Sequence, residues 1–105
     1  MINLVQWIKA CNLDQVKEGQ LFGLNHDDKK ILIANQKGKI HATDLICTHA
    51  EADLSTGFLS DEGVRCPLHL SVFNLENGEP QNLPAENPLK VYNVKIEQDE
   101  IYVEV

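Results

Sequence analysis

Two short segments, each with one cysteine and one histidine, constrain this chain more than any other feature of its 105 residues. The first is Cys47-Thr48-His49, and sixteen residues separate it from the second, Cys66-Pro67-Leu68-His69. Together the segments offer two thiolates and two imidazoles, a donor set that suits zinc or an iron-sulfur cluster. The chain is therefore expected to fold so that two loops meet at one metal centre.

The order of the Cys and His donors along the chain distinguishes a zinc site from an iron-sulfur cluster. Zinc fingers usually pair Cys with Cys and His with His around one tetrahedral ion. Here each segment is mixed, which suits a binuclear centre with both thiolates on one iron and both imidazoles on the other. The pattern predicts one [2Fe-2S] cluster per chain, with the ligands Cys47, His49, Cys66 and His69. Zinc at these four residues, or buried Cys and His side chains that bind no metal, stay as alternatives.

The residues around the two segments resemble the Rieske-type ferredoxins, especially the small soluble ones of bacterial aromatic-ring-hydroxylating dioxygenase systems. The resemblance covers nearly the whole chain and is carried by Leu54-Ser55-Thr56-Gly57, Val64-Arg65-Cys66-Pro67-Leu68-His69, Gly78-Glu79-Pro80 and Pro84. It implies that His49 and His69 hold an outer iron near the surface. It also implies a third loop, around Gly78, Pro80 and Pro84, that covers the cluster.

Some positions depart from the patterns of this family. High-potential members carry an extra Cys in each loop, where this chain has Ala52 and Leu68. Ser71 is retained after the second ligand His, but Phe73 replaces a tyrosine, so one hydroxyl donor is lost. We therefore expect a midpoint in the lower part of the range of about -150 to +300 mV that Rieske centres cover. Phe73 is equally expected as a plain core residue.

Charge and cysteine content restrict the partners and the compartment. With 16 acidic and 9 basic residues the net charge is -7, which disfavours nucleic acid or anionic membrane and favours a basic protein partner. The third cysteine, Cys11, has no remaining partner for an intramolecular disulfide, which favours a reducing, cytoplasmic location. No apolar run approaches the roughly twenty residues of a membrane span, and Met1 to Trp7 has no signal-peptide pattern.

Short β-forming stretches between polar turns predict an all-β fold. The expected strands are 4–9, 20–24, 30–35, 39–44, 64–66, 72–75, 89–96 and 100–105. A helical turn or loop is expected at 12–19, and the last two strands should form a hairpin through Gln98-Asp99. Some eight to ten short strands argue for an antiparallel β-sandwich or barrel.

The length predicts a single domain, 1–105. Within it, glycine and proline punctuate short apolar pieces from 45 to 84, which predicts a cluster-binding subdomain inserted into a base of 1–44 and 85–105. The Rieske fold that the resemblance implies would place the ligand loops at one tip of this base. Trp7 is expected in the core or at a seam, and Cys11 as a small buried hydrophobe. His26 is expected in a turn and His41 on a strand, both at the surface or rim.

The leading functional hypothesis is a soluble one-electron carrier that is not itself an enzyme. It would pass electrons from an NAD(P)H-dependent flavin reductase to a terminal oxygenase that docks at the His49/His69 tip. The alternatives are a small Rieske subunit of a larger reductase, such as an assimilatory nitrite reductase, and a non-catalytic module that senses redox state or is stabilised by zinc. The chain lacks room for the mononuclear iron site of an oxygenase.

Overall fold

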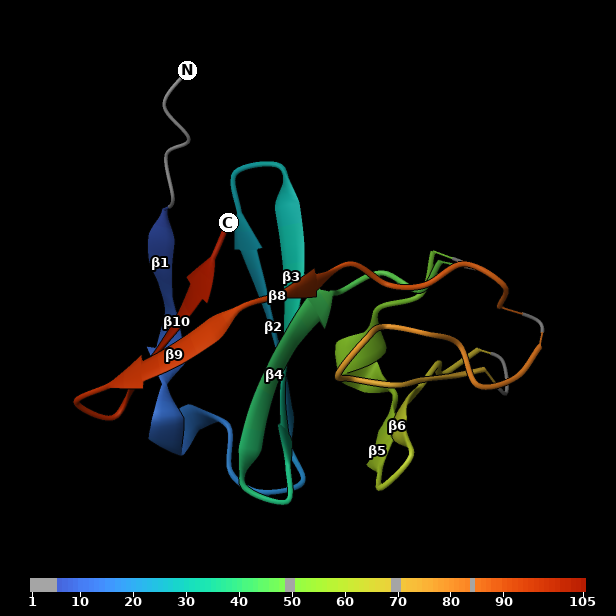
Figure 1. Ribbon diagram of the computed structural model, residues 1–105, viewed down its shortest axis with the longest axis horizontal. Coiled ribbons are helices and arrows are strands. Elements are labelled where there is room, and N and C mark those ends of the chain that lie inside the picture. Colours follow the sequence, from blue (N-terminus) through green and yellow to red (C-terminus); the bar gives the residue numbers. More distant parts are fainter. Residues whose placement is uncertain (1–5, 49–50, 69–70, 84) are drawn as a thin grey trace.

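The computed structural model describes residues 6–48, 51–68, 71–83 and 85–105. In these residues ten strands form three antiparallel sheets, and two 3-10 turns but no α-helix accompany them (Figure 1). The expected all-β antiparallel fold is therefore confirmed. The strands are β1 (Trp7–Asn12), β2 (Leu21–His26), β3 (Lys29–Gln36), β4 (Lys39–Asp44), β5 (Phe58–Ser60), β6 (Gly63–Arg65), β7 (Val72–Phe73), β8 (Val91–Tyr92), β9 (Val94–Glu97) and β10 (Glu100–Glu104).

The first sheet joins the two ends of the chain in the order β1-β10-β9. Trp7 pairs with Glu104, and the buried residues Ile8 and Val103 face each other across the same ladder. The β9–β10 hairpin turns at Gln98 and Asp99, both with positive φ (50° and 63°), as a two-residue turn of matching twist requires. The predicted closing hairpin is thus present.

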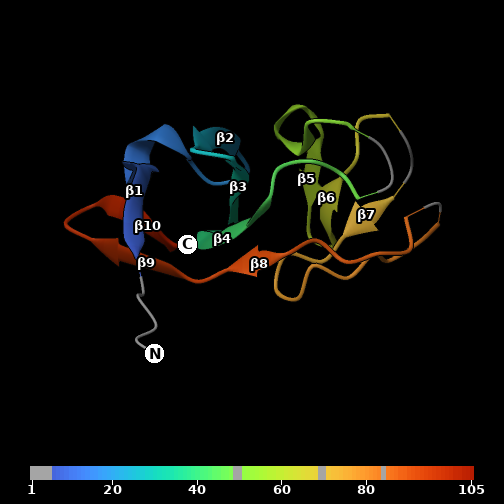
Figure 2. The same cartoon turned by 90° about the horizontal axis from the view of Figure 1, so that it is seen from above.

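The second sheet, in the order β2-β3-β4-β8, lies between the other two sheets, and its strand β3 divides two hydrophobic cores (Figure 2). Successive side chains of a strand point to opposite faces. Ile31 and Ile33 therefore enter a core with the first sheet, whereas Leu32 and Ala34 enter the core that contains both predicted cysteine ligands. This is why 31–35 is one continuous buried run rather than an alternating pattern.

The third sheet, β5-β6-β7, stands at the end of the molecule opposite the first sheet (Figures 1 and 2). Its strands have two or three residues each, and they flank the second predicted ligand segment. Strand β5 was not predicted from the sequence. A 3-10 turn, η2 (Leu54–Thr56), precedes it.

Four sequence predictions need correction. The predicted strand 89–96 is divided: β8 pairs with β4, whereas β9 pairs with β10 in another sheet. The predicted first strand, 4–9, is β1 from Trp7 to Asn12, with residues 4 and 5 outside the described part of the chain. His26 ends β2 and pairs with Lys29, so only Asp27 and Asp28 form the turn. His41, expected at the surface or rim, is only 7% exposed.

The remaining predictions for this part of the chain agree with the structure. A 3-10 turn, η1 (Leu13–Gln15), occupies the stretch expected as a helical turn or loop. Cys11 is buried, and Trp7 is half-buried with Lys95 Nζ 4.7 Å from its ring centroid. No helix of the described residues has the length and apolarity needed to cross a membrane.

Candidate metal centre

The two predicted cysteine ligands begin loops that are built alike. Cys47 follows β4, and its backbone N–H donates to the carbonyl of Ala52 at 3.0 Å. Cys66 follows β6, and its N–H donates to the carbonyl of Ser71 at 2.9 Å. Each loop is therefore closed five residues after its cysteine. His49 and His69, the other two predicted ligands, belong to these loops but lie outside the described residues.

The base of the first loop continues as a short antiparallel pairing. Ile46 and Asp53 form an isolated bridge, and the N–H of Leu54 donates to the carbonyl of Leu45 at 2.9 Å. The Asp53 carboxylate then caps η2 by accepting from the backbone N–H of Ser55 at 2.8 Å. Because backbone hydrogen bonds hold both strands of the loop base, the position of Cys47 is fixed relative to β4.

Gly57 brings the first loop region against the strand that leads to Cys66. A Cβ atom at this position would collide with the carbonyl oxygen of Arg65, so only glycine permits the approach. Arg65 immediately precedes Cys66 and pairs with Phe58 across the β5–β6 ladder. Gly57 therefore couples the two ligand loops through direct contact of their backbones.

A third segment, 78–87, is bonded to both loops. The Thr48 hydroxyl donates to the carbonyl of Asn87 at 2.7 Å, and the N–H of Ala85 donates to Ser71 Oγ at 2.9 Å. The segment starts at Gly78, where φ is +77° and where a Cβ atom would collide with the carbonyl of Leu89. It corresponds to the predicted third loop, of which Pro84 lies outside the described residues.

Both cysteines lie in one apolar core. Cys47 is 4% exposed and Cys66 is 1% exposed, and neither forms a disulfide. The other buried members of this core are Leu32, Ala34, Leu45, Ala52, Leu54, Val64, Phe73, Leu75, Ala85 and Leu89. Phe73 is fully buried, as expected of a core residue, and Ala52 packs beside the first cysteine. The shell excludes water from both sulfur atoms.

The donor chemistry fits a bound iron-sulfur group. A thiolate has no favourable partner in an apolar core unless a metal or a hydrogen bond compensates its charge. Two such sulfur atoms in one shell suit the cysteine half of a centre with two Cys and two His ligands. Among the described residues no group of three His, Cys, Asp or Glu side chains could hold a metal ion, so the histidine half depends on residues outside that set.

Ser71 is a polar residue of this shell that the sequence had singled out. Its side chain is fully buried, and its hydroxyl oxygen accepts the hydrogen bond from Ala85. A serine hydroxyl has one hydrogen to donate in addition to its acceptor sites. Ser71 can thus hold the third segment while its hydrogen points to a second group.

The two spare histidines lie in the base rather than in this shell. His41 lines a hollow of about 280 Å³ together with Lys39, Glu76 and Tyr92. Burial lowers the pKa of His41, and the charge of Lys39 adds to this effect. His26 Nε2 lies 3.5 Å from the Asp27 carboxylate at the end of β2.

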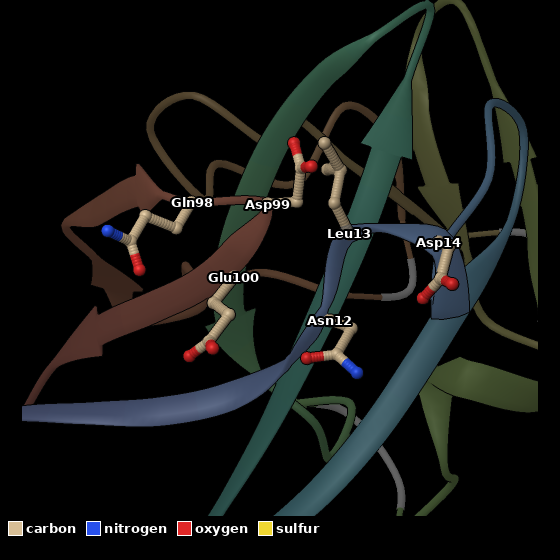
Figure 3. A pocket seen from close by; sticks show the side chains of 6 residues that line it. All are labelled: Asn12, Leu13, Asp14, Gln98, Asp99 and Glu100. Carbon is tan, nitrogen blue, oxygen red and sulfur yellow. The ribbon is translucent and has the colours of Figure 1, made fainter.

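A second hollow, of about 530 Å³, also lies in the base (Figure 3). It opens between η1 and the β9–β10 turn, where the N–H of Leu13 donates to the carbonyl of Asp99 at 2.8 Å. Asp14, Asp99 and Glu100 make its lining acidic, and Glu100 already accepts from the Tyr102 hydroxyl and pairs with Lys9. Neither Cys47 nor Cys66 lines this hollow.

Sequence reasoning missed the contacts that join the loops. Thr48, Ala85 and Asn87 contribute through backbone atoms or a hydroxyl, which no spacing rule detects. Gly57 was noticed only as part of a family pattern. A glycine that ends a capped turn before a short strand is the one signal that could have indicated a close backbone approach.

Comparison with known proteins gives a consistent result. The family model of the Rieske [2Fe-2S] domain matches residues 6–93. A ferredoxin component of naphthalene 1,2-dioxygenase/salicylate 5-hydroxylase systems from Ralstonia sp. is 40% identical over 91 residues, 87% of this chain and 88% of the relative. The ferredoxin subunit of a biphenyl dioxygenase from Pseudomonas sp. (strain KKS102) is 38% identical, covering 91% of this chain and 89% of the relative.

A solved structure agrees with these relatives. One chain of a complex of reduced oxygenase and oxidised ferredoxin in carbazole 1,9a-dioxygenase superposes with a TM-score of 0.87 at 31% identity. The match covers 92% of this chain and 91% of that chain.

Proposed function

This chain belongs to the Rieske [2Fe-2S] domain family, and from that premise we propose that it carries single electrons from a flavin-containing NAD(P)H reductase to a terminal ring-hydroxylating oxygenase. It holds one [2Fe-2S] cluster, which takes up and releases one electron without making or breaking bonds in a substrate. The observation that carries the proposal is the pair of buried cysteines at the starts of two similarly closed loops, in a chain 40% identical to a dioxygenase ferredoxin component.

We assign the ligands as the sequence predicts: Cys47 and Cys66 to one iron, His49 and His69 to the other. The burial of the two cysteines in one core supports the first half of the assignment. The second half is supported by the position of each histidine two or three residues after its cysteine, within the same closed loop. Analysis of iron and acid-labile sulfide tests it, with two of each expected per chain, whereas one zinc ion and no sulfide would refute it.

We also propose that 45–84 is a cluster-binding subdomain inserted into a base of 1–44 and 85–105. In support, the third sheet lies within 58–73, whereas the first two sheets are built from residues before 45 and after 90. Such a division separates two tasks. The base supplies a rigid support, and the inserted part holds the cofactor at one end.

The partners follow from the named relatives. These belong to naphthalene/salicylate, biphenyl and carbazole systems, and one superposing chain comes from a complex with an oxygenase. A carrier that contacts only proteins needs no aromatic pocket. The aromatic substrate is therefore selected by the oxygenase, and this protein is an electron-transfer component rather than the catalyst. The cytoplasmic location stays part of the proposal.

Reconstitution of electron transfer tests the function. Purified protein with its cluster is mixed with NADH, a dioxygenase flavin reductase and the terminal oxygenase of a naphthalene 1,2-dioxygenase or a biphenyl dioxygenase system. Product formation should depend on this protein and should stop when it is left out. If dithionite reduces this protein but the reduced protein transfers no electron to either oxygenase, the proposed function is wrong. Native size-exclusion chromatography that finds it permanently bound in a reductase would favour the subunit alternative.

A further inference from the structure

The negative charge of the chain is concentrated at the cluster end. The segment 45–90, between β4 and β8, contains seven acidic and two basic residues, whereas the rest of the chain contains nine acidic and seven basic residues. A net charge of -5 thus belongs to the smaller part of a molecule whose total is -7. All seven acidic side chains of this segment are exposed.

Ion pairs with the base engage two of these seven acidic side chains. Lys37 Nζ lies 3.0 Å from the Asp61 carboxylate, and Lys39 Nζ lies 3.3 Å from that of Glu76. Glu51, in the first ligand loop, and Glu86, in the third segment, form no ion pair with any basic side chain that the structure describes. Asp61 and Glu76 are therefore partly neutralised by the base, whereas Glu51 and Glu86 are not.

Three large apolar side chains among the described residues of this segment are exposed: Phe58 lies on β5, and the other two lie beside the ligand loops. Leu68 is 66% exposed and lies in the second ligand loop, and Leu83 is 71% exposed and lies in the third segment. Figure 1 shows that the described parts of the ligand loops and of the third segment lie toward the end of the molecule opposite β1. Exposed leucines at one end of a charged surface are typical of a contact with another protein.

Hydrogen bonds hold described residues beside each of these leucines. The hydrogen bond from Cys66 to Ser71 closes the loop of Leu68, and the N–H of Val72 donates to the Asn82 side chain, next to Leu83, at 2.8 Å. Each leucine thus lies near a hydrogen-bonded contact, and contact residues that are held before binding lower the entropic cost of association.

We propose that Leu68 and Leu83 form the apolar centre, and Glu51 and Glu86 the acidic rim, of the surface that docks the terminal oxygenase. We call these four residues the docking tip. Such a surface fits an oxygenase face on which lysine and arginine side chains surround an apolar patch. The apolar centre supplies affinity, and the acidic rim speeds and orients the encounter. The inference rests on the proposed function, since it names the docking surface for that partner.

Matched pairs of variants separate the docking tip from general charge or hydrophobicity. Glu51→Gln with Glu86→Gln removes two negative charges from the tip, and Glu18→Gln with Asp28→Asn removes two from exposed positions of the base. Leu68→Ser with Leu83→Ser removes the apolar centre, and Ile96→Ser removes an apolar side chain, 46% exposed, from β9. Cluster content and midpoint potential are measured for each variant, so that rates are compared at known driving force.

The measurement is the second-order rate at which the reduced protein is oxidised by the oxygenase that accepts electrons from the wild type, followed by stopped flow as ionic strength rises. The wild-type rate should fall with salt. The Glu51/Glu86 variant should lose about tenfold at low salt and show a shallower salt dependence. The Leu68/Leu83 variant should lose about tenfold or more with its salt dependence unchanged, and both base variants should match the wild type.

Equal losses in the tip and base variants, or a wild-type rate that does not fall with salt, would overturn the inference while leaving the carrier function intact. A wild-type protein that reduces no oxygenase would instead refute the proposed function itself.

Discussion

The backbone N–H of Ala85 donates a 2.9 Å hydrogen bond to the hydroxyl oxygen of Ser71, and both residues are buried. This bond ties the third segment to the end of the second ligand loop. It is complemented on the other loop by the bond from the Thr48 hydroxyl to the carbonyl of Asn87. One segment therefore braces both loops, and a change in either bond should alter the cluster environment without touching a ligand.

The Ser71→Ala variant should be less stable and should have a lower midpoint potential. Loss of the Ser71 hydroxyl leaves the buried Ala85 N–H without its hydrogen-bond acceptor, which lowers the free energy of unfolding by about 1–3 kcal/mol. A hydroxyl that donates toward the cluster favours the reduced, more negative form, so its removal should lower the midpoint. Urea unfolding and redox titration measure the two effects. Ser60→Ala, at an exposed position, is the control and should change neither.

The midpoint potential of the wild-type cluster can also be predicted from these side chains. Because Phe73 has no hydroxyl to donate, we expect a value below about +150 mV. A higher value would show that residues other than Ser71 and Phe73 set the potential.

The Gly57→Ala variant should destabilise the protein by about 1–3 kcal/mol and impair cluster assembly. The added methyl group would collide with the carbonyl of Arg65, which is backbone and cannot rotate away. Thermal unfolding and the iron content of freshly purified protein measure the outcome. Gly23→Ala serves as the comparison, because its methyl group would meet flexible side chains, with the nearest atom, Leu45 Cδ1, at 3.2 Å. Equal losses in both variants would argue against a special role for Gly57.

Stability should fall on mild acidification because of His41. Burial lowers the pKa of His41 below its ordinary value of 6.5, so below that pH the unfolded chain binds a proton that the folded protein resists. The stabilisation is complete above about pH 6.5 and is lost as the pH falls through the folded-state value. Facing groups act in both directions, because Lys39 strengthens the shift and Glu76 opposes it.

Urea unfolding of the wild type and of His41→Gln between pH 5.5 and 7.5 measures this effect. The variant should lose most of the pH dependence over this interval, whereas His26→Gln, the control, should keep it. An unchanged slope in His41→Gln would assign the acid sensitivity to other groups.

The Cys66→Ser variant should fail to retain the cluster, with loss of the visible absorbance and of bound iron and sulfide. The control variant, Cys11→Ala, should retain the absorbance and the bound iron and sulfide, because Cys11 packs with Ile8 and Ile101 in the other core. Burial also raises the pKa of the Cys11 thiol, so it stays protonated and is a poor metal ligand. A cluster that survives Cys66→Ser but not Cys11→Ala would refute the ligand assignment.

The sequence alone was sufficient where the determinants are local. Turn residues placed the β9–β10 hairpin at Gln98 and Asp99, and alternation together with polar turns indicated the antiparallel strands. The spacing of Cys47, His49, Cys66 and His69 predicted the cofactor, because a metal centre requires particular atoms at short separations along two loops. That ligand set stays a prediction for all four residues.

Only the tertiary structure decided which strands pair with one another in the sheets. The apolar pattern from Leu89 to Ile96 is continuous, yet β8 pairs with β4 and β9 pairs with β10, since pairing depends on residues some fifty positions earlier and a few positions later. In the same way, Leu32 and Ile33 look equivalent in sequence but face different cores, and His41 is buried by segments that no local pattern connects to it. Chemistry that resides in short motifs can be inferred from the chain, whereas burial and strand partnership are properties of contacts between distant residues and appear only when the chain has folded.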